Sequence, residues 1–240
     1  MLSATRRCWL SLAVVAALGT TGAEAQVVEF ETNQPGTSFL VELNPTDDPN
    51  LQGLVDNFLL YVTSNLYDGV VINRAVEDFV VQMGSFTTST LDPASVNGNT
   101  FTSISTFAPV VVDGDNNGLV DFPTLSNTRG TISLALNATG PNSGTSSFFV
   151  NLDDNGFLDG QGFVPFARIV NIAPINAINS ATRVDLSQEV GASGSLTFID
   201  FPVFGDPEEL LVIERAVVIP EPAGLLTVTL GMMAAAARRR

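Results

Sequence analysis

Two side chains that can donate hydrogen bonds stand among apolar, β-forming residues in the stretch from 71 to 86. Arg74 precedes Ala-Val, and Gln82 follows Phe-Val-Val, so each lies in a segment suited to a strand. A guanidinium is permanently charged and planar, so Arg74 can donate hydrogen bonds without a proton transfer. The chain has no histidine, and its only cysteine is Cys8. These features favour chemistry by fixed hydrogen-bond donors and leave no histidine or cysteine nucleophile in this stretch.

Two further segments repeat the theme of one polar group among apolar and aromatic residues. They are Gly140-Pro-Asn-Ser-Gly-Thr-Ser-Ser-Phe-Phe-Val-Asn-Leu152 and Phe157-Leu-Asp-Gly-Gln-Gly-Phe-Val-Pro-Phe-Ala-Arg-Ile169. In order and spacing, the three segments resemble the cyclophilins, the peptidyl-prolyl cis-trans isomerases. Where that family has Phe-His-Arg, Phe and Gln-Gly-Gly, this chain has Asn73-Arg74, Phe79 and Gln82-Met83-Gly84. The resemblance covers roughly residues 27–219 and is strongest over 55–86 and 126–170.

This resemblance implies rotation of the peptide bond that precedes a proline. Resonance gives that bond a barrier of about 18–20 kcal/mol, and a donor near the proline nitrogen weakens the resonance. Arg74 matches the catalytic arginine, and Gln82 matches the glutamine that binds the substrate backbone and orients the arginine. Phe79, which belongs with this catalytic set, and Phe149 match the two phenylalanines of the proline pocket. The substrate-binding positions implied by the resemblance are Val80, Ala135, Phe149, Phe157, Leu158 and Phe163.

Four positions depart from the residues usual in the family. Asn73 stands in place of a histidine before the arginine, and Ser147 replaces a glutamine before the paired phenylalanines. Phe157 replaces a tryptophan, and Phe163 lies at or near the position of a histidine. The set of arginine, glutamine and phenylalanines is intact, whereas cyclosporin affinity, turnover rate and substrate choice stay open.

A stretch of acidic residues and asparagines has the spacing of a calcium loop. Its oxygen ligands fall at relative positions 1, 3, 5 and 9, with glycine at position 6. The glutamate expected at position 12 is replaced by Thr124, and no helical pattern flanks the loop. An acidic turn within a long loop explains the same residues, and no cofactor is predicted for the enzyme. The candidate ligands are Asp113, Asp115, Asn117 and Asp121.

Short apolar runs separated by turn residues predict a mainly β domain. The resemblance implies a closed eight-stranded antiparallel barrel capped by two helices. The first helix is predicted to begin after Asp48, with Pro49 at its first position, and to end at Asn65. The second is predicted from Ala173 to Thr182. Polar residues predict surface loops over 87–128 and 184–206. Strands are predicted at 27–31, 38–43, 69–73, 79–83, 131–136, 147–152, 163–170 and 210–218.

The two ends of the chain have the composition of export and sorting segments. Residues 1–25 combine two arginines, an apolar run and the pattern Ala23-Glu-Ala25, which predicts a secretory signal peptide. Residues 220–240 combine Pro220-Glu-Pro222, an apolar run and three arginines, and resemble the PEP-CTERM sorting tail of Gram-negative bacteria. That resemblance implies an exosortase-type sorting enzyme as a partner and transient anchoring in the inner membrane. A plain C-terminal anchor is the alternative.

Between these ends, residues 26–219 are long enough for one domain with a sizeable core. They hold five arginines, no lysine and 23 acidic residues, which gives a formal charge of −18. Such a surface repels nucleic acid and anionic membranes. The cyclophilin resemblance implies proline-containing polypeptides as partners, and the domain is expected to be a monomer.

The sequence thus predicts an exported peptidyl-prolyl isomerase that assists the folding of secreted or envelope proteins. The expected location is the periplasm, cell surface or extracellular matrix of a Gram-negative bacterium. One alternative is a non-catalytic module that binds proline peptides or acts as a chaperone. Another is a surface-displayed matrix protein built on the same scaffold. Arg74 and Gln82 favour the enzyme.

Overall fold

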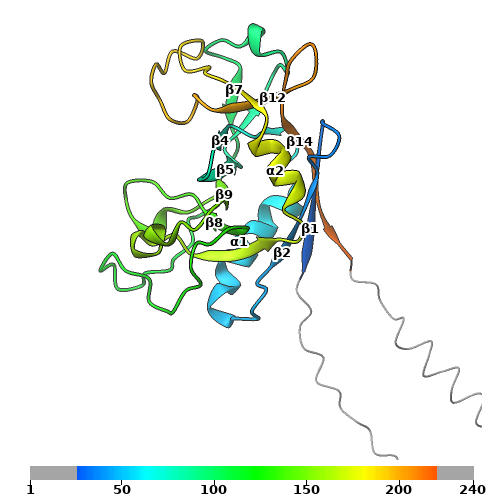
Figure 1. Cartoon of the computed structure of the whole chain (residues 1–240). Helices are drawn as coiled ribbons and strands as arrows, with labels where there is room; N and C mark the ends of the chain where they lie inside the picture. The colour runs from blue at the N-terminus through cyan, green and yellow to red at the C-terminus, as the bar shows by residue number, and fades with distance from the viewer. Residues whose placement is uncertain (1–25, 221–240) are drawn as a thin grey trace, which may run out of the picture.

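The computed structural model describes residues 26–220, so the predicted signal peptide and all but the first residue of the predicted tail lie outside it. Its strands form a large antiparallel sheet, which curls around α1, and a small three-stranded sheet (Figure 1). The mainly β class is therefore confirmed.

The order is β4-β5-β9-β8-β10-β2-β1-β14-β3-β6-β7 in the large sheet and β11-β12-β13 in the small one. The elements are β1 (Val27–Thr32), β2 (Phe39–Leu43), α1 (Gln52–Thr63), β3 (Val70–Val71), β4 (Arg74–Val76), β5 (Val80–Met83), β6 (Phe86–Thr88), β7 (Phe101–Ser103), β8 (Thr131–Leu134), β9 (Phe148–Asn151), β10 (Pro165–Ile169), α2 (Ala173–Asn179), β11 (Thr182–Val184), β12 (Phe201–Phe204), β13 (Glu209–Leu210) and β14 (Val212–Ile219), with 3-10 turns at Pro49–Leu51, Pro93–Ser95, Pro141–Ser143 and Gly156–Gln161.

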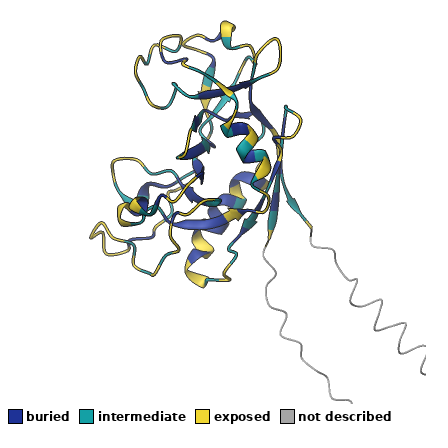
Figure 2. Cartoon of the chain, viewed as in Figure 1, coloured by how far each residue is buried: buried dark blue, intermediate teal, exposed yellow. Residues whose placement is uncertain are grey.

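Aromatic side chains fill the space between the curled sheet and α1. Strands β1 and β2 bury every second residue, which is the pattern of a sheet with one face on the core. The ring of Phe58 on α1 lies 5.1 Å from that of Phe148 and 5.4 Å from that of Phe166. Figure 2 shows the buried residues gathered on the inner faces of the sheet and of α1. This core fixes the strands that carry the candidate site.

The first predicted helix is confirmed, including its start. The Asp48 carboxylate accepts a hydrogen bond of 2.9 Å from the backbone N–H of Asn50, and Pro49 opens the first turn. A single 3-10 turn then leads into α1, which ends at Thr63, and Asn65 has a φ of 55°. Asparagine tolerates this left-handed conformation better than most residues, so it ends the helix here. The second helix is also present but shorter than predicted, because α2 ends at Asn179.

The large sheet leads around the core and returns to the stretch of chain from which it started. β4 is its first strand, and β3 pairs with β14 further along the order. Only Ile72 and Asn73 separate β3 from β4 in the chain. The described ladders thus form a curled antiparallel sheet.

The prediction of surface loops at 87–128 and 184–206 is wrong in part. β7 lies in the first segment and β12 in the second, and their side chains form a second apolar cluster. Phe201 is fully buried and stacks on Phe101, with ring centres 5.0 Å apart. These strands have only three and four residues, too few for alternation to be visible. They pair with neighbouring strands in the chain, whereas the stack of Phe101 on Phe201 joins segments that are far apart in sequence. Residues 104–130 contain no helix or strand, so the loop prediction holds there.

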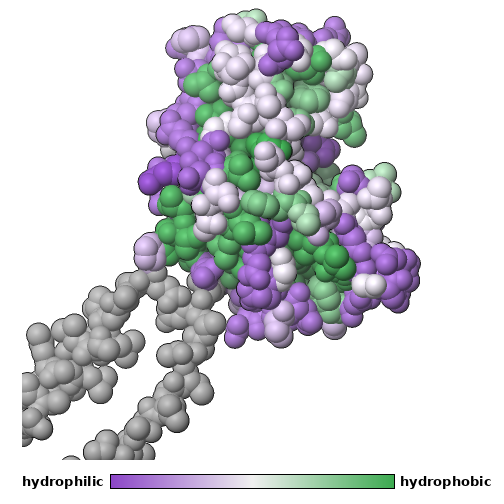
Figure 3. Space-filling view, turned by 180° about the vertical axis from the view of Figure 1, so that it is seen from behind, coloured by the Kyte–Doolittle hydropathy of each residue, from purple (hydrophilic) through white to green (hydrophobic). Residues whose placement is uncertain are grey.

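Within residues 26–220, no helix is long and apolar enough to cross a membrane. The apolar run of the predicted tail, 223–237, lies beyond this range. On the face seen in Figure 3, apolar side chains lie in separate patches between hydrophilic ones.

Candidate active site

Arg74 and Gln82 lie directly opposite each other on neighbouring antiparallel strands. The register of β4 and β5 pairs Arg74 with Gln82 and Val76 with Val80. Residues that are opposite in such a pair project from the same face of the sheet. The turn between the two strands thus brings together the two polar residues that the sequence singled out.

A cavity of about 150 Å³ lies beside these two residues. Eight of the nine predicted site residues line it, and Leu136 is an additional lining residue that the sequence did not predict. Phe157 is not in the lining: it is 62% exposed, and its ring stacks on Phe79 at 6.0 Å between centres. The complete lining is Arg74, Phe79, Val80, Gln82, Ala135, Leu136, Phe149, Leu158 and Phe163.

The floor of the cavity is apolar and separate from the main core. Val80, Phe149 and Leu158 are buried and form their own cluster. The ring of Phe163 meets that of Phe149 edge to face, with centres 5.6 Å apart and planes inclined by 70°. The strands β5 and β9 present this floor because Gln82 pairs with Phe149 across them. Such a slot suits a small apolar ring.

Arg74 provides the cationic side of the cavity. It is half-buried, and its guanidinium carbon lies 5.6 Å from the centre of the Phe79 ring. Within the described part of the chain its Nε is buried and has no hydrogen-bond partner. Burial lowers the pKa of Arg74 below the ordinary value for arginine, and the charge of Asp200 opposes this shift. The side chain remains a cation near neutral pH, since an arginine pKa starts so high.

Gln82 is held by the residue that replaces the usual glutamine of the resembled family. Its Nε2 donates to the hydroxyl of Ser147 at 3.2 Å, and this hydroxyl lies 3.3 Å from the Met83 carbonyl, to which it can donate. A hydroxyl can donate and accept at once, so Ser147 links the side chain of Gln82 to its own strand. The Gln82 carbonyl oxygen is left for other donors.

A family model described as "Cyclophilin type peptidyl-prolyl cis-trans isomerase/CLD" matches residues 27–191. The chain belongs to this cyclophilin family. The prediction of a peptidyl-prolyl isomerase is thereby confirmed.

Curated cyclophilins from bacteria align with about half of this chain. Peptidyl-prolyl cis-trans isomerase cyp18 of Streptomyces antibioticus is 32% identical over 146 residues, which are 58% of this chain and 75% of the relative. Isomerase A of Dickeya dadantii is 36% identical over 128 residues, 52% of this chain and 57% of the relative. Isomerase B of Escherichia coli is 32% identical over 133 residues, 52% and 70% respectively.

Solved cyclophilin structures share the fold. A crystal structure of a Cryptosporidium parvum cyclophilin covers 82% of this chain and 99% of its own, with a TM-score of 0.53 and 21% identity. A structure of the same parasite protein in the presence of the dipeptide Ala-Pro has a TM-score of 0.52 and 20% identity. Identity at this level supports the fold alone.

Buried asparagines fix the loops that form this cyclophilin's pocket. The side-chain amide of Asn155 donates to the Phe79 carbonyl at 2.9 Å, and that of Asn127 donates to the Phe163 carbonyl at 2.8 Å. Both asparagines also bond to the side chain of Asn151, at 2.9 and 3.2 Å. Sequence reasoning missed these residues because asparagine is typical of turns. Their signal was a polar residue between apolar neighbours of a strand, as in Phe-Phe-Val-Asn151.

Gly84 allows the end of β5 to approach the start of β9. Its φ is 94°, and a Cβ at this position would lie 2.4 Å from the Ser146 carbonyl oxygen. Only glycine fits here without moving the backbone that leads to Phe149. This explains the glycine that ends the Gln82-Met83-Gly84 motif.

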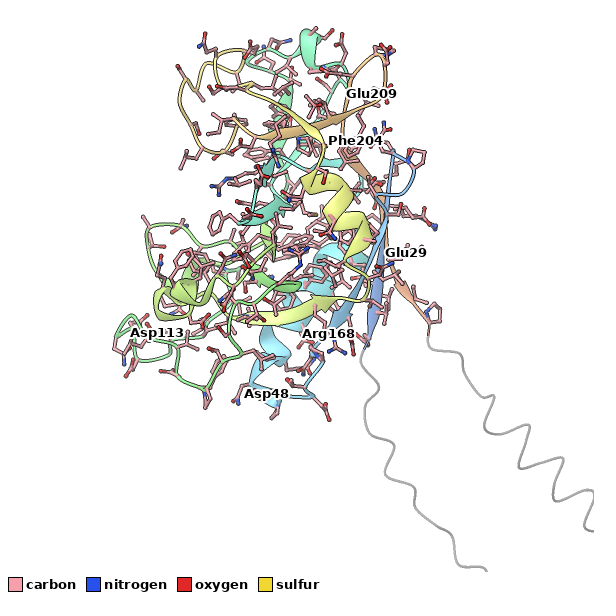
Figure 4. All side chains as sticks on the ribbon, viewed as in Figure 1. Glu29, Asp48, Asp113, Arg168, Phe204 and Glu209 are labelled. Atoms are coloured by element: carbon pink, nitrogen blue, oxygen red, sulfur yellow. The ribbon has the colours of Figure 1, made fainter. Side chains whose placement is uncertain are left out.

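The candidate calcium loop lies away from the pocket lining, in the long loop at the outer edge of the molecule (Figure 4). Carboxylate oxygens of Asp113, Asp115 and Asp121 lie within 4.8 Å of one another. Asp113 is 3% exposed, and backbone N–H groups of Asn117 and Gly118 donate to its two oxygens at 3.1 and 2.8 Å. These bonds are those of an acidic turn, and calcium binding stays a prediction.

Proposed function

We propose that this cyclophilin rotates X–Pro bonds with Arg74 as the donor to the proline nitrogen. The proline ring enters the apolar slot floored by Phe149, beside the half-buried guanidinium. Donation to the nitrogen competes with the resonance that keeps the bond planar, so the twisted state is bound better than either planar isomer. No covalent bond forms or breaks, and no proton is transferred.

The observation that carries this proposal is the pairing of Arg74 with Gln82 at the rim of an apolar cavity. Gln82 is placed to bind the substrate backbone, because Ser147 fixes its amide nitrogen. Phe157 lies exposed beyond Phe79 and can extend the apolar surface along a bound peptide. Proline-containing polypeptides are therefore the proposed substrates.

The test is exchange spectroscopy on Ala-Pro peptides, in which NMR cross-peaks report interconversion of the cis and trans forms. The full chain should accelerate exchange without any added cofactor. An unchanged thermal rate at high protein concentration, together with binding of the peptide, would instead support a non-catalytic proline-binding module.

The barrel can be argued from the continuity of β3 and β4. If these two strands are counted as one bent strand, the order β4-β5-β9-β8-β10-β2-β1-β14-β3 becomes a cycle of eight. That cycle supports the predicted closed eight-stranded barrel capped by α1 and α2, with β6 and β7 as an extension. Strong protection of the Ile72 and Asn73 amides from hydrogen exchange would agree with closure, and rapid exchange there would oppose it.

We further propose that the protein is exported and assists folding outside the cytoplasm. The signal peptide over 1–25 and the sorting tail over 220–240 motivate this location, and both fall almost entirely outside the described residues. Val27 pairs with Ile219 across β1 and β14, so both segments join the domain at the same end of this central strand pair. Their removal by a signal peptidase and an exosortase would therefore leave the pocket intact. Mass spectrometry of extracellular material should find chains that lack the terminal arginines; only intact chains would leave a plain anchor.

A further inference from the structure

The outer edge of β4, the strand that carries Arg74, is bound by the segment around the small sheet. β4 is the first strand of the large sheet, so one of its edges has no ladder partner there. The Ala75 N–H on that edge donates to the Asp200 carbonyl at 2.9 Å, and the Ala75 carbonyl accepts from Nε of Arg183. Both groups would otherwise be unpaired in a fully buried residue. The edge is thus satisfied from outside the large sheet.

Arg183 connects this edge to the end of α2. Its Nη2 donates to the carbonyl of Asn179 and lies 3.2 Å from the side-chain oxygen of the same residue. The planar guanidinium therefore bonds to β4 at one nitrogen and to the last residue of α2 at another. Figure 1 shows α2 between the upper lobe, with β7 and β12, and the lower part of the molecule. In Figure 4, Phe204 at the end of β12 lies directly above α2.

Arginines are scarce in this domain, and Arg183 is used differently from the two that form ion pairs, although the exposed Arg129 also donates to neutral oxygens, those of Leu152 and Asn176. Arg168 and Arg215 form exposed ion pairs with Glu42 and Glu31. Among the described residues, Arg183 forms no ion pair, and its donors go to neutral amide oxygens. A half-buried cation that donates only to neutral oxygens carries a desolvation cost in free energy. That cost is offset only where the geometry of its hydrogen bonds is needed for folding or function.

Arg74 depends on its backbone for its position. Its buried Nε has no partner among the described residues, and the Phe79 ring is the aromatic contact of its guanidinium. A shift of β4 at Ala75 would therefore move Arg74 relative to the cavity. We propose that Arg183 is a positioning residue for catalysis, which fixes the edge of β4 so that the guanidinium of Arg74 stays over the proline pocket. This inference rests on the proposed role of Arg74.

The test uses the full chain and measures kcat and KM on an Ala-Pro peptide together with the urea midpoint. Arg183→Ala should lower kcat by about tenfold, because small displacements of a catalytic group are costly, and should change KM less than twofold. Arg183→Lys should recover part of the lost kcat. Its ammonium group can donate to the Ala75 carbonyl, but it lacks the planar guanidinium that also reaches Asn179. Arg168→Ala, which removes an exposed cation, is the matched control and should keep the wild-type kcat.

A spectroscopic measurement separates positioning from general destabilisation. In protein labelled with 15N, the Nε–H group of Arg74 should show greater mobility in Arg183→Ala, while the backbone signals of strands remote from β4 stay unchanged. A folded Arg183→Ala protein with wild-type kcat would overturn the inference. A decrease in activity that only follows the unfolded fraction would also overturn it.

Further variants distinguish failure of the inference about Arg183 from failure of the proposed role of Arg74. If Arg183→Ala does not fold, Arg183→Lys and Asn179→Ala still decide, because each removes only part of the link between α2 and β4. Wild-type kcat in both would overturn the inference. Arg74→Ala serves as the reference: if it retains full activity, the proposed role of Arg74 fails. If it is inactive while the Arg183 variants are normal, only the inference fails.

Discussion

The guanidinium carbon of Arg74 lies 5.6 Å from the centre of the Phe79 ring. A cation over an aromatic face gains about 0.5–1 kcal/mol at exposed sites and more where water is excluded. The Phe79 ring also stacks on the exposed ring of Phe157, with ring centres 6.0 Å apart. The proposed catalytic cation is therefore aligned by an aromatic side chain that also lines the pocket.

Phe149→Ala should reduce both folding stability and peptide binding. Phe149 is 5% exposed and forms the floor of the pocket with Val80 and Leu158. Truncation of a buried phenylalanine costs about 3–5 kcal/mol, so the urea midpoint should fall clearly and KM should rise. Phe157→Ala is the matched control, since this ring is exposed, and its stability should change by about 0.5 kcal/mol or less. Equal stability losses in both variants would contradict the assigned floor.

The rate of isomerisation should be nearly constant from about pH 5 to 9. The chain has no histidine, and its only cysteine is Cys8 in the predicted signal peptide. Burial lowers the pKa of Arg74, so this side chain loses its charge at a lower pH than an exposed arginine does. Because the ordinary pKa of arginine lies far above this range, the cation persists throughout it. A bell-shaped profile in a domain that remains folded would mean that a carboxylate takes part.

Asp159→Asn should weaken the support of Phe163 in the pocket, because Asp159 accepts hydrogen bonds from Asn127, which donates to the Phe163 carbonyl. It should also change how folding stability depends on pH under acidic conditions. Burial raises the pKa of Asp159, but hydrogen bonds from Ser126 and Asn127 outweigh it, and the pKa lies below the ordinary 3.8. The carboxylate therefore stabilises the fold fully above the unfolded value, and this contribution is lost as pH falls through the lower, folded value. The variant should unfold at lower urea at pH 7 and show a shallower loss of stability below about pH 4. An unchanged dependence of folding stability on pH under acidic conditions would contradict this.

Removal of divalent metals should leave the isomerisation rate unchanged. The proposed donor is a guanidinium, and none of the residues that line the cavity belongs to the acidic loop from Asp113 to Asp121. The rate on an Ala-Pro peptide should be equal before and after dialysis against EDTA. Loss of activity that calcium restores would show that the loop, rather than the pocket residues alone, controls catalysis.

Family resemblance, more than local pattern, pointed to the pocket residues, because Phe79, Leu158 and Phe163 lie outside the strands. The register that places Arg74 opposite Gln82 was not predicted from the sequence and is visible only in the structure. Leu136 was missed because alternation predicts that it faces away from Ala135, whereas β8 ends at Leu134 and the rule no longer applies. A prediction from alternation holds only as far as the strand extends.

The second apolar cluster could not be predicted for a different reason. β12 has four residues, and its stability comes from pairing with β11 and from Phe101, which lies far away in sequence. Single-sequence patterns do not contain such distant pairings. The bonds of Arg183 to Ala75 and Asn179 are also long-range or cross-element contacts that only coordinates can show.

Substitution of Arg74 tests the central claim most directly. Arg74→Ala should lower isomerase activity at least tenfold, because loss of one donor aimed at a transition state costs about 2.7–4 kcal/mol. Arg74→Lys should also stay below wild type, since an ammonium lacks the planar fork. Arg74 is half-buried at the rim of the cavity, so the free energy of unfolding should change by no more than about 1–2 kcal/mol.

The decisive measurement is therefore the NMR exchange rate of an Ala-Pro peptide with wild type and Arg74→Ala, read beside the urea midpoint of each protein. The account predicts a folded variant, with a midpoint close to wild type, whose catalysed exchange is reduced tenfold or more. A folded variant with undiminished exchange, or a variant that unfolds, would show that Arg74 is structural and would contradict the account.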